Sequence, residues 1–142
     1  MPAKFTKHGV NFLYPENWAL DEEELSGDQS VTVCSPTGGF WSVAVHKGSI
    51  DPLNLANAAL EAMKKEYQDL EVEEVNETLA GREMIGYDLN FFLFDFTNTA
   101  QIRSLKCNQA IYTIFCQAKD NEFEQIQRVF QAMTISLING LK

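Results

Sequence analysis

The stretch REMIGYDLNFFLFDFTNTAQIRSLKCNQAIYTIFCQAK, residues 82–119, decides the fold of this chain. It is rich in β-branched and aromatic residues, which favour strands, and polar residues interrupt it at 97–99 and at 108–109. From Tyr87 onward apolar residues first alternate with polar ones and then occupy both parities as far as Phe94. This pattern is typical of a strand with one solvated end and one end buried on both faces. We therefore predict three consecutive antiparallel strands.

Two-residue turns at 98–99 and 108–109 would fix which residues face each other across these strands. One face would then belong to the core and carry Phe92, Phe94, Leu105, Tyr112 and Ile114, with Arg103 in the row of Phe94 and Ile114. A one-residue error in either turn would exchange the two faces.

The opposite face mixes apolar and polar side chains, which allows two interpretations. Its members are Phe91, Leu93, Ile102, Ser104, Lys106, Ile111, Thr113 and Phe115. A helix can cover such a face, and we favour this interpretation because large exposed apolar patches are uncommon on monomers. If the face is open, these eight residues are the candidate partner-binding site.

Composition bounds the classes of function. A chain of 142 residues fits one domain, residues 1–142, and its 45% hydrophobic content is that of a globular protein. The net charge of −9 argues against nucleic-acid binding, which uses clustered Lys and Arg against phosphates. We interpret the acidity as a means of solubility rather than as a dedicated site for a basic partner.

The beginning of the chain and its cysteines bear on the compartment. The opening MPAKFTKHG has no apolar region or cleavage site of a secretory signal, and no later segment is long enough to span a bilayer. If Met1 is the native start, we expect a cytoplasmic protein without membrane insertion. The three cysteines, Cys34, Cys107 and Cys116, agree with a reducing compartment, and we predict no disulfide between Cys107 and Cys116.

Further strands are predicted outside the central stretch. They are 4–8 and 10–14, a hairpin of 31–35 with 40–47, and an acidic strand 70–78 at a sheet edge, where charge discourages pairing with other chains. The acidic run at 21–24 is interpreted as a solvated edge or loop. A catalytic carboxylate pair in that run is the weaker alternative, because consecutive acids share one environment and their pKa values are not driven apart.

Two amphipathic helices complete the predicted elements. Asp51 caps the first, a proline follows it at the first helical position, and the helix ends near Tyr67 or Gln68. Asp120 or Asn121 caps the second, with Glu124 available for a capping box. The apolar stripes are Leu53, Ala56, Leu60, Met63 and Tyr67 in the first helix, and Phe123, Ile126, Phe130, Met133 and Leu137 in the second. Both helices are therefore predicted to lie on the sheet.

Catalytic and metal chemistry find little support in the residues. His8 and His46, the chain's two histidines, have no partner at a standard ligand spacing, so we predict neither a metal nor another cofactor. No G-x-S-x-G nucleophile motif is present, and the cysteines resemble small apolar strand residues. The alternative that stays open is a small enzyme whose site is assembled from dispersed acidic and Tyr or Cys residues.

The run GVNFLYPENW at 9–18, followed by a hairpin, a helix, a long meander and a final helix, resembles the Mog/PsbP-like superfamily. Its most specific part is Phe12 through Trp18, similar to the aromatic-Pro-x-x-Trp opening of those domains. The resemblance implies an α+β fold, a single antiparallel sheet of about six or seven strands with two main helices packed on it, and it implies no catalysis.

Members of that superfamily are adaptors, among them Ran-binding Mog proteins, the PsbP subunit of photosystem II and chaperones of secreted effectors. The resemblance to the chaperones implies a partner that is another protein, an apolar segment of a secreted effector being one candidate, and it allows a homodimer. We therefore expect a non-enzymatic, cytoplasmic protein-binding or chaperone-like module that uses one face of its sheet. The small enzyme is the alternative.

Overall fold

The computed structural model describes residues 2–7, 9–25 and 28–141, and these form nine strands and two helices. In chain order the elements are β1 (Pro2–Lys7), β2 (Val10–Pro15), β3 (Ala19–Leu25), β4 (Asp28–Cys34), β5 (Phe40–Lys47), α1 (Pro52–Glu66), β6 (Glu71–Leu79), β7 (Arg82–Leu93), β8 (Phe96–Cys107), β9 (Ala110–Lys119) and α2 (Asp120–Asn139). The predicted strand 4–8 corresponds to β1, and its last residue, His8, lies outside the described residues.

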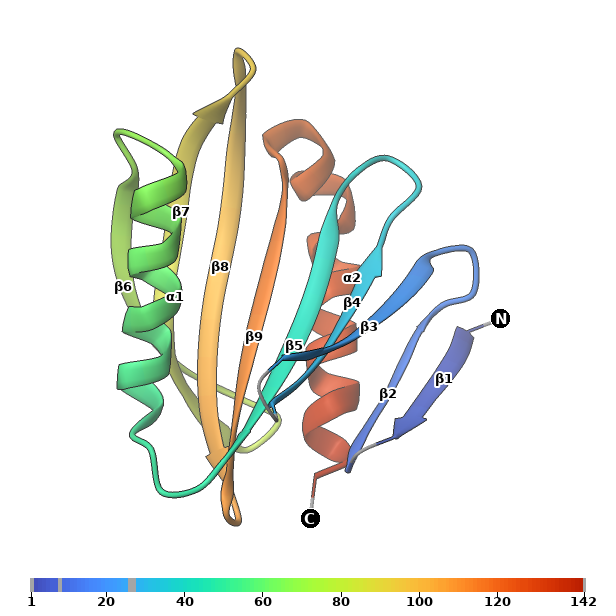
Figure 1. Ribbon diagram of the computed structural model, residues 1–142. Helices are drawn as coiled ribbons and strands as arrows, with labels where there is room; N and C mark the ends of the chain where they lie inside the picture. Colours follow the sequence, from blue (N-terminus) through green and yellow to red (C-terminus); the bar gives the residue numbers. More distant parts are fainter. Residues whose placement is uncertain (1, 8, 26–27, 142) are drawn as a thin grey trace.

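Seven of these strands form one antiparallel sheet in the order β3-β4-β5-β9-β8-β7-β6, and β1 pairs with β2 in a separate hairpin. Helix α1 packs on one face against β7, β8 and β9, while α2 packs on the other against β8, β9 and β2 (Figure 1). The predicted α+β fold with one antiparallel sheet and two helices is thus confirmed. The acidic segments β3 and β6 are the two edge strands.

The turn between β8 and β9 was predicted correctly, whereas the turn between β7 and β8 was not. Leu105 pairs with Tyr112 as expected. Phe92 pairs with Thr97 rather than with Leu105, because the β7–β8 turn lies at Phe94 and Asp95. The polar residues that suggested a turn at 98–99 instead continue β8. The shift is an even number of residues, so each side chain keeps its predicted face of the sheet.

The wrong turn nevertheless places two predicted core residues in solvent. Phe92 is 71% exposed and Phe94 is 86% exposed, whereas Leu105, Tyr112 and Ile114 are buried as predicted. The reason is the length of the β7–β8 hairpin. In the described sheet β6 pairs with β7 only as far as Asn90, and β9 pairs with β8 only from Asn98 onward. The end of the hairpin therefore extends past both neighbouring strands.

Helix α1 begins and ends at the predicted residues, whereas the N-cap of α2 lies one residue earlier than predicted. The Asp51 carboxylate accepts a hydrogen bond from the backbone amide of Leu53 at 3.0 Å, and Tyr67 is the C-terminal cap. The N-cap of α2 is Lys119, with no side-chain capping bond, so the predicted cap and capping box are wrong. The physical reason is that β9 runs directly into the helix and the Asp120 carboxylate accepts a bond from the Thr99 hydroxyl at 2.7 Å.

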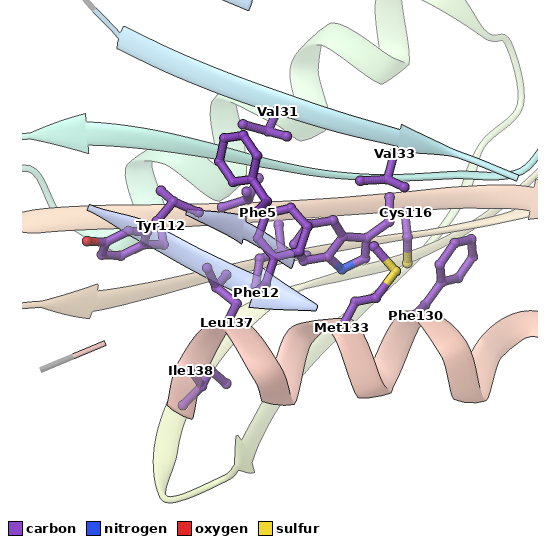
Figure 2. Close-up of a cluster of buried hydrophobic side chains, with 14 of the residues drawn as sticks. Phe5, Phe12, Val31, Val33, Tyr112, Cys116, Phe130, Met133, Leu137 and Ile138 are labelled. Carbon is purple, nitrogen blue, oxygen red and sulfur yellow. The ribbon is translucent and has the colours of Figure 1, made fainter. Parts of the chain in front are cut away.

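Two hydrophobic clusters hold the layers together. The larger one lies between the sheet, α2 and the β1–β2 hairpin, and Figure 2 shows Phe130, Met133 and Leu137 of α2 directed toward Phe12 and the sheet. Within it the rings of Phe12 and Trp41 are 4.9 Å apart, and the Trp41 indole donates to the Thr134 hydroxyl at 3.0 Å. The smaller cluster joins the sheet to α1. Both helices therefore stabilise β8 and β9 from opposite sides.

Candidate functional site

The face predicted as a partner-binding surface is mostly covered. Phe91, Ile102, Ser104, Ile111 and Thr113 are buried, Leu93 and Phe115 are half-buried, and only Lys106 of the eight is exposed. The interpretation that a helix covers this face is confirmed, because α1 lies on it. The five buried residues cannot contact a partner in this structure, which corrects their assignment to a binding surface.

The apolar stripe of α1 explains this coverage. Ala56, Leu60 and Met63 pack in one cluster with Leu89 and Ile102 of the sheet. The polar pair that made the face look like a binding surface is satisfied internally, since the hydroxyls of Ser104 and Thr113 lie 3.1 Å apart across β8 and β9. A cross-strand hydroxyl pair of this kind is compatible with burial.

The end of the β7–β8 hairpin is the most exposed apolar feature among the described residues. Phe92 is 71% exposed, Phe94 86% and Phe96 56%. Figure 1 shows this hairpin, in yellow, rising above the other elements. We call Phe92, Phe94 and Phe96 the aromatic tip. It is the candidate functional site, because three exposed phenylalanines within five residues, Phe92 and Phe96 on opposite faces of the hairpin and Phe94 in its turn, lie outside the packed core.

The backbone of the aromatic tip supports this assignment. The two turn residues adopt positive φ, 51° at Phe94 and 66° at Asp95. Two-residue hairpin turns of this kind strongly favour Asn-Gly, and a bulky aromatic residue at positive φ is an outlier. Phe94 is thus unfavourable here both for its backbone conformation and for its exposure to water. Such combinations concentrate at sites that are retained for binding rather than for stability.

Side chains at the base of the aromatic tip fix its direction. The Asn90 amide donates to the Thr99 hydroxyl at 3.0 Å, and the Asn98 amide donates to the carbonyl of Phe96 at 3.0 Å. The Lys119 ammonium lies 4.9 Å from the centre of the Phe96 ring, within the range of a cation–π contact. The three rings are therefore presented on a supported hairpin.

A polar network on the other side of β8 surrounds Arg103, which is 6% exposed. Its guanidinium contacts Glu77 through Nε and Asp88 through Nη2, both at 2.7 Å. Nη1 donates to the carbonyls of Tyr87 at 3.1 Å and Ile102 at 3.0 Å. Burial lowers the pKa of Arg103, but the two carboxylates outweigh burial and raise the pKa above its ordinary value.

The Arg103 network borders a polar cavity of about 340 Å³ beneath α2. In this cavity the Cys116 thiol lies 3.7 Å from the amide oxygen of Gln101, and burial raises the pKa of the thiol to about 12. A thiol with this pKa stays protonated near neutral pH and is a poor nucleophile. Because Arg103 is held by protein partners on three nitrogens, the arrangement is that of a structural ion-pair network.

Within residues 2–7, 9–25 and 28–141 no group of three or more His, Cys, Asp or Glu side chains could hold a metal ion. In the same part of the chain no helix is long and apolar enough to cross a membrane.

Sequence reasoning missed the aromatic tip although the sequence contained a signal for it. The acidic strand predicted at 70–78, joined to the meander by the turn at 80–82, is too short to accompany that meander beyond residue 91 or so. Any strand residue after that point lacks a neighbour on one side. The polarity of residues 97–99 indicates a turn, but polar residues are also common in exposed strands, and here they continue β8.

The fold can now be compared with known proteins. Neither protein-family models nor curated protein sequences give a match. Among solved structures, the chain is similar to the cyanobacterial PsbP protein, CyanoP, of Synechocystis sp. PCC 6803. The identity is 11%, with a TM-score of 0.67, and the match covers 95% of this chain and 90% of that one.

Two further structures resemble the chain over most of its length. One is PA94 of Pseudomonas aeruginosa, a protein of unknown function, with 10% identity, a TM-score of 0.56 and coverage of 96% and 95%. The other is LpqN, involved in cell envelope biogenesis of Mycobacterium tuberculosis, with 15% identity, a TM-score of 0.51 and coverage of 94% and 86%. At these identities the similarity shows the fold, and the chain has a PsbP-like fold.

Proposed function

From a PsbP-like fold that carries an exposed aromatic tip, we propose that this chain is a non-enzymatic protein-binding module that contacts its partner through Phe92, Phe94 and Phe96. The observation that carries the proposal is the exposure of these rings, 71%, 86% and 56%, on a turn with positive φ. Together they expose about 400 Å² of aromatic surface. Burial of the Phe94 ring alone, which is 86% exposed, would contribute about 4 kcal/mol before the costs of association are subtracted.

The charge around the aromatic tip supports a protein partner over an anionic surface. The chain carries a net charge of −9, and Asp95 lies within the turn itself. Nucleic acids and anionic lipid headgroups would be repelled by this charge. A protein with an apolar pocket satisfies the same aromatic rings without that repulsion, because aromatic anchors that fill pockets dominate protein interfaces.

The proposed contact region differs from the one predicted from the sequence. The expected binding module used a sheet face, whereas the aromatic tip lies at the end of that sheet. A chaperone-like role would then consist of holding an apolar segment of another protein against the tip. A cytoplasmic location belongs to the same proposal and is compatible with the absence of a membrane-spanning helix among the described residues.

Site-specific photo-cross-linking tests the proposal in cells of the source organism. A benzophenone amino acid replaces Phe94 in one variant and Val72, which is 40% exposed on β6, in the matched control. We expect a discrete cross-linked partner from position 94 and none of that mass from position 72. Once the partner is identified, Phe94→Ala should weaken its binding by about 30-fold. Equal cross-linking from both positions would refute the aromatic tip as the contact surface.

A further inference from the structure

A second apolar feature lies between β2 and α2. Here the end of β2 and the turn that follows it, with Leu13 and Pro15, face Val129, Ala132 and Met133 of α2 across a groove of about 650 Å³. Leu13 is 44% exposed and Met133, at 2%, is buried. We call this feature the β2–α2 groove. Its volume falls within the range of pockets that enclose small ligands, so it has room for a tight turn with an aromatic side chain.

The two walls of the β2–α2 groove are fixed to each other. The backbone amide of Leu13 donates to the Ser136 hydroxyl at 2.9 Å, which ties β2 to α2 beside the groove. Trp18, just after the turn, packs edge-on against Phe130 at 5.9 Å between ring centres. The groove is therefore a preformed cavity, and a ligand would not need to order it.

The aromatic tip has the apolar side chains and a charged neighbour that suit this groove. Phe94 and its neighbouring rings are apolar, as is most of the groove lining. The exposed Asp95 lies next to Phe94, and the groove carries Arg128 on its α2 wall and Glu16 on the wall that follows β2. A tip that enters with Asp95 on the α2 side would bring its carboxylate toward the Arg128 guanidinium, which is the complementary arrangement of charge.

The tip and the groove of one chain cannot meet. The hairpin extends past Lys119, just before the start of α2, whereas the groove begins at Arg128 and faces the later turns of that helix. Figure 1 shows the hairpin rising from the sheet end near the start of α2, away from the β1–β2 hairpin. An aromatic tip that enters this groove therefore belongs to a second copy.

We propose that the aromatic tip of one copy inserts into the β2–α2 groove of a second copy and produces a head-to-tail association. The inference rests on the proposed function, since it names a second copy as a partner of the same tip. The contact uses different surfaces on the two copies, so each complex keeps one open tip and one open groove. Because the tip is small compared with a standard protein interface, the association is weak and appears at micromolar to millimolar concentration.

Complementation between two variants of the full chain tests this geometry. The tip variant combines Phe94→Asn with Asp95→Gly, and the groove variant is Ala132→Glu, a change at an exposed helical position. Sedimentation velocity from 10 µM to 1 mM should show concentration-dependent association of the wild type and monomers for each variant alone. An equimolar mixture of the two should form a 1:1 dimer, because one supplies an intact tip and the other an intact groove. Val72→Ser is the control and should associate like the wild type.

Two results would overturn the inference: a wild type that stays monomeric at 1 mM, or a mixture that stays monomeric although the wild type associates. The latter would indicate a symmetric contact in place of the head-to-tail one. Thermal unfolding of each variant checks that it is folded. A monomeric wild type that still cross-links another protein through position 94 would overturn this inference and leave the proposed function standing.

Discussion

The Asn-Gly tip variant, Phe94→Asn with Asp95→Gly, is expected to be more stable than the wild type while losing its binding surface. In the structure these two residues adopt φ of 51° and 66°. The left-handed conformation costs an ordinary residue about 1–2 kcal/mol, and Asn and Gly tolerate it best. Relief at Phe94 is worth about 1.5 kcal/mol, and Asp95→Gly adds little because aspartate already tolerates this conformation.

Replacement of the Phe94 ring removes little buried apolar surface. Phe94 is 86% exposed, so its ring buries only about 30 Å², worth about 0.7 kcal/mol. The net expectation is an increase of about 1 kcal/mol in the free energy of unfolding, with a rise of about 3 °C in Tm. Urea unfolding can be followed by fluorescence, because Trp18 and Trp41 are both buried.

Phe96→Ser provides the comparison for this variant. It removes another ring of the aromatic tip without changing a residue of positive φ, and it also removes the contact with Lys119. We expect this variant to be no more stable than the wild type. If the Asn-Gly variant instead loses 1 kcal/mol or more, Phe94 stabilises the fold and its conformation is no argument for a binding role.

Three further predictions concern the interior. Arg103→Met should lower the free energy of unfolding by about 1–2 kcal/mol, measured by urea titration, because it removes the shared partner of two partly exposed carboxylates. An unchanged midpoint would contradict the structural role of that network. Gly86→Ala should lower the free energy of unfolding by more than about 3 kcal/mol, because an added Cβ would lie 1.8 Å from the carbonyl oxygen of Ile102. A soluble variant with a wild-type Tm would disprove this close approach. Burial raises the pKa of the Cys116 thiol from 9.0 to about 12. As the pH rises between these values, the thiol is deprotonated in the unfolded chain but still protonated in the folded one, so the free energy of unfolding falls by about 1.4 kcal/mol per pH unit. Cys116→Val should make the stability curve shallower from pH 9 to 10.5, and identical curves for both proteins would exclude this thiol as the cause.

Most of the architecture could be predicted because local signals agreed with one another. Asp51 and the proline after it mark the start of α1, and the residue that ends the helix, Tyr67, was also anticipated. The β8–β9 turn at 108–109 was found because polar residues there interrupt two clearly apolar strands. In these places side-chain chemistry and backbone geometry favour the same conformation, which is the condition under which sequence reasoning succeeds.

The candidate site was not predicted because its residues are not those that its turn and its exposure to water normally favour. Phe94 and Asp95 occupy a turn that favours Asn and Gly, so an apolar segment was interpreted as buried strand. The mixed face opposite was interpreted as a possible surface, yet Ser104 and Thr113 satisfy each other beneath α1. In both cases the deciding fact was which neighbours lie beside the strand, and the alternation of residues along one strand does not specify these.

The edges of the sheet give an independent reason why contacts with other proteins would use the hairpin end. Sheets often bind partners by adding a strand to an exposed edge. Here both edge strands are acidic: β6 carries Glu71, Glu73, Glu74 and Glu77, and β3 carries Asp21 and Glu22 among its acidic residues. Charge along an edge discourages strand addition. The faces of the central strands β7, β8 and β9 are occupied by α1 and α2, so at this sheet the aromatic tip offers apolar surface without strand addition or displacement of a helix.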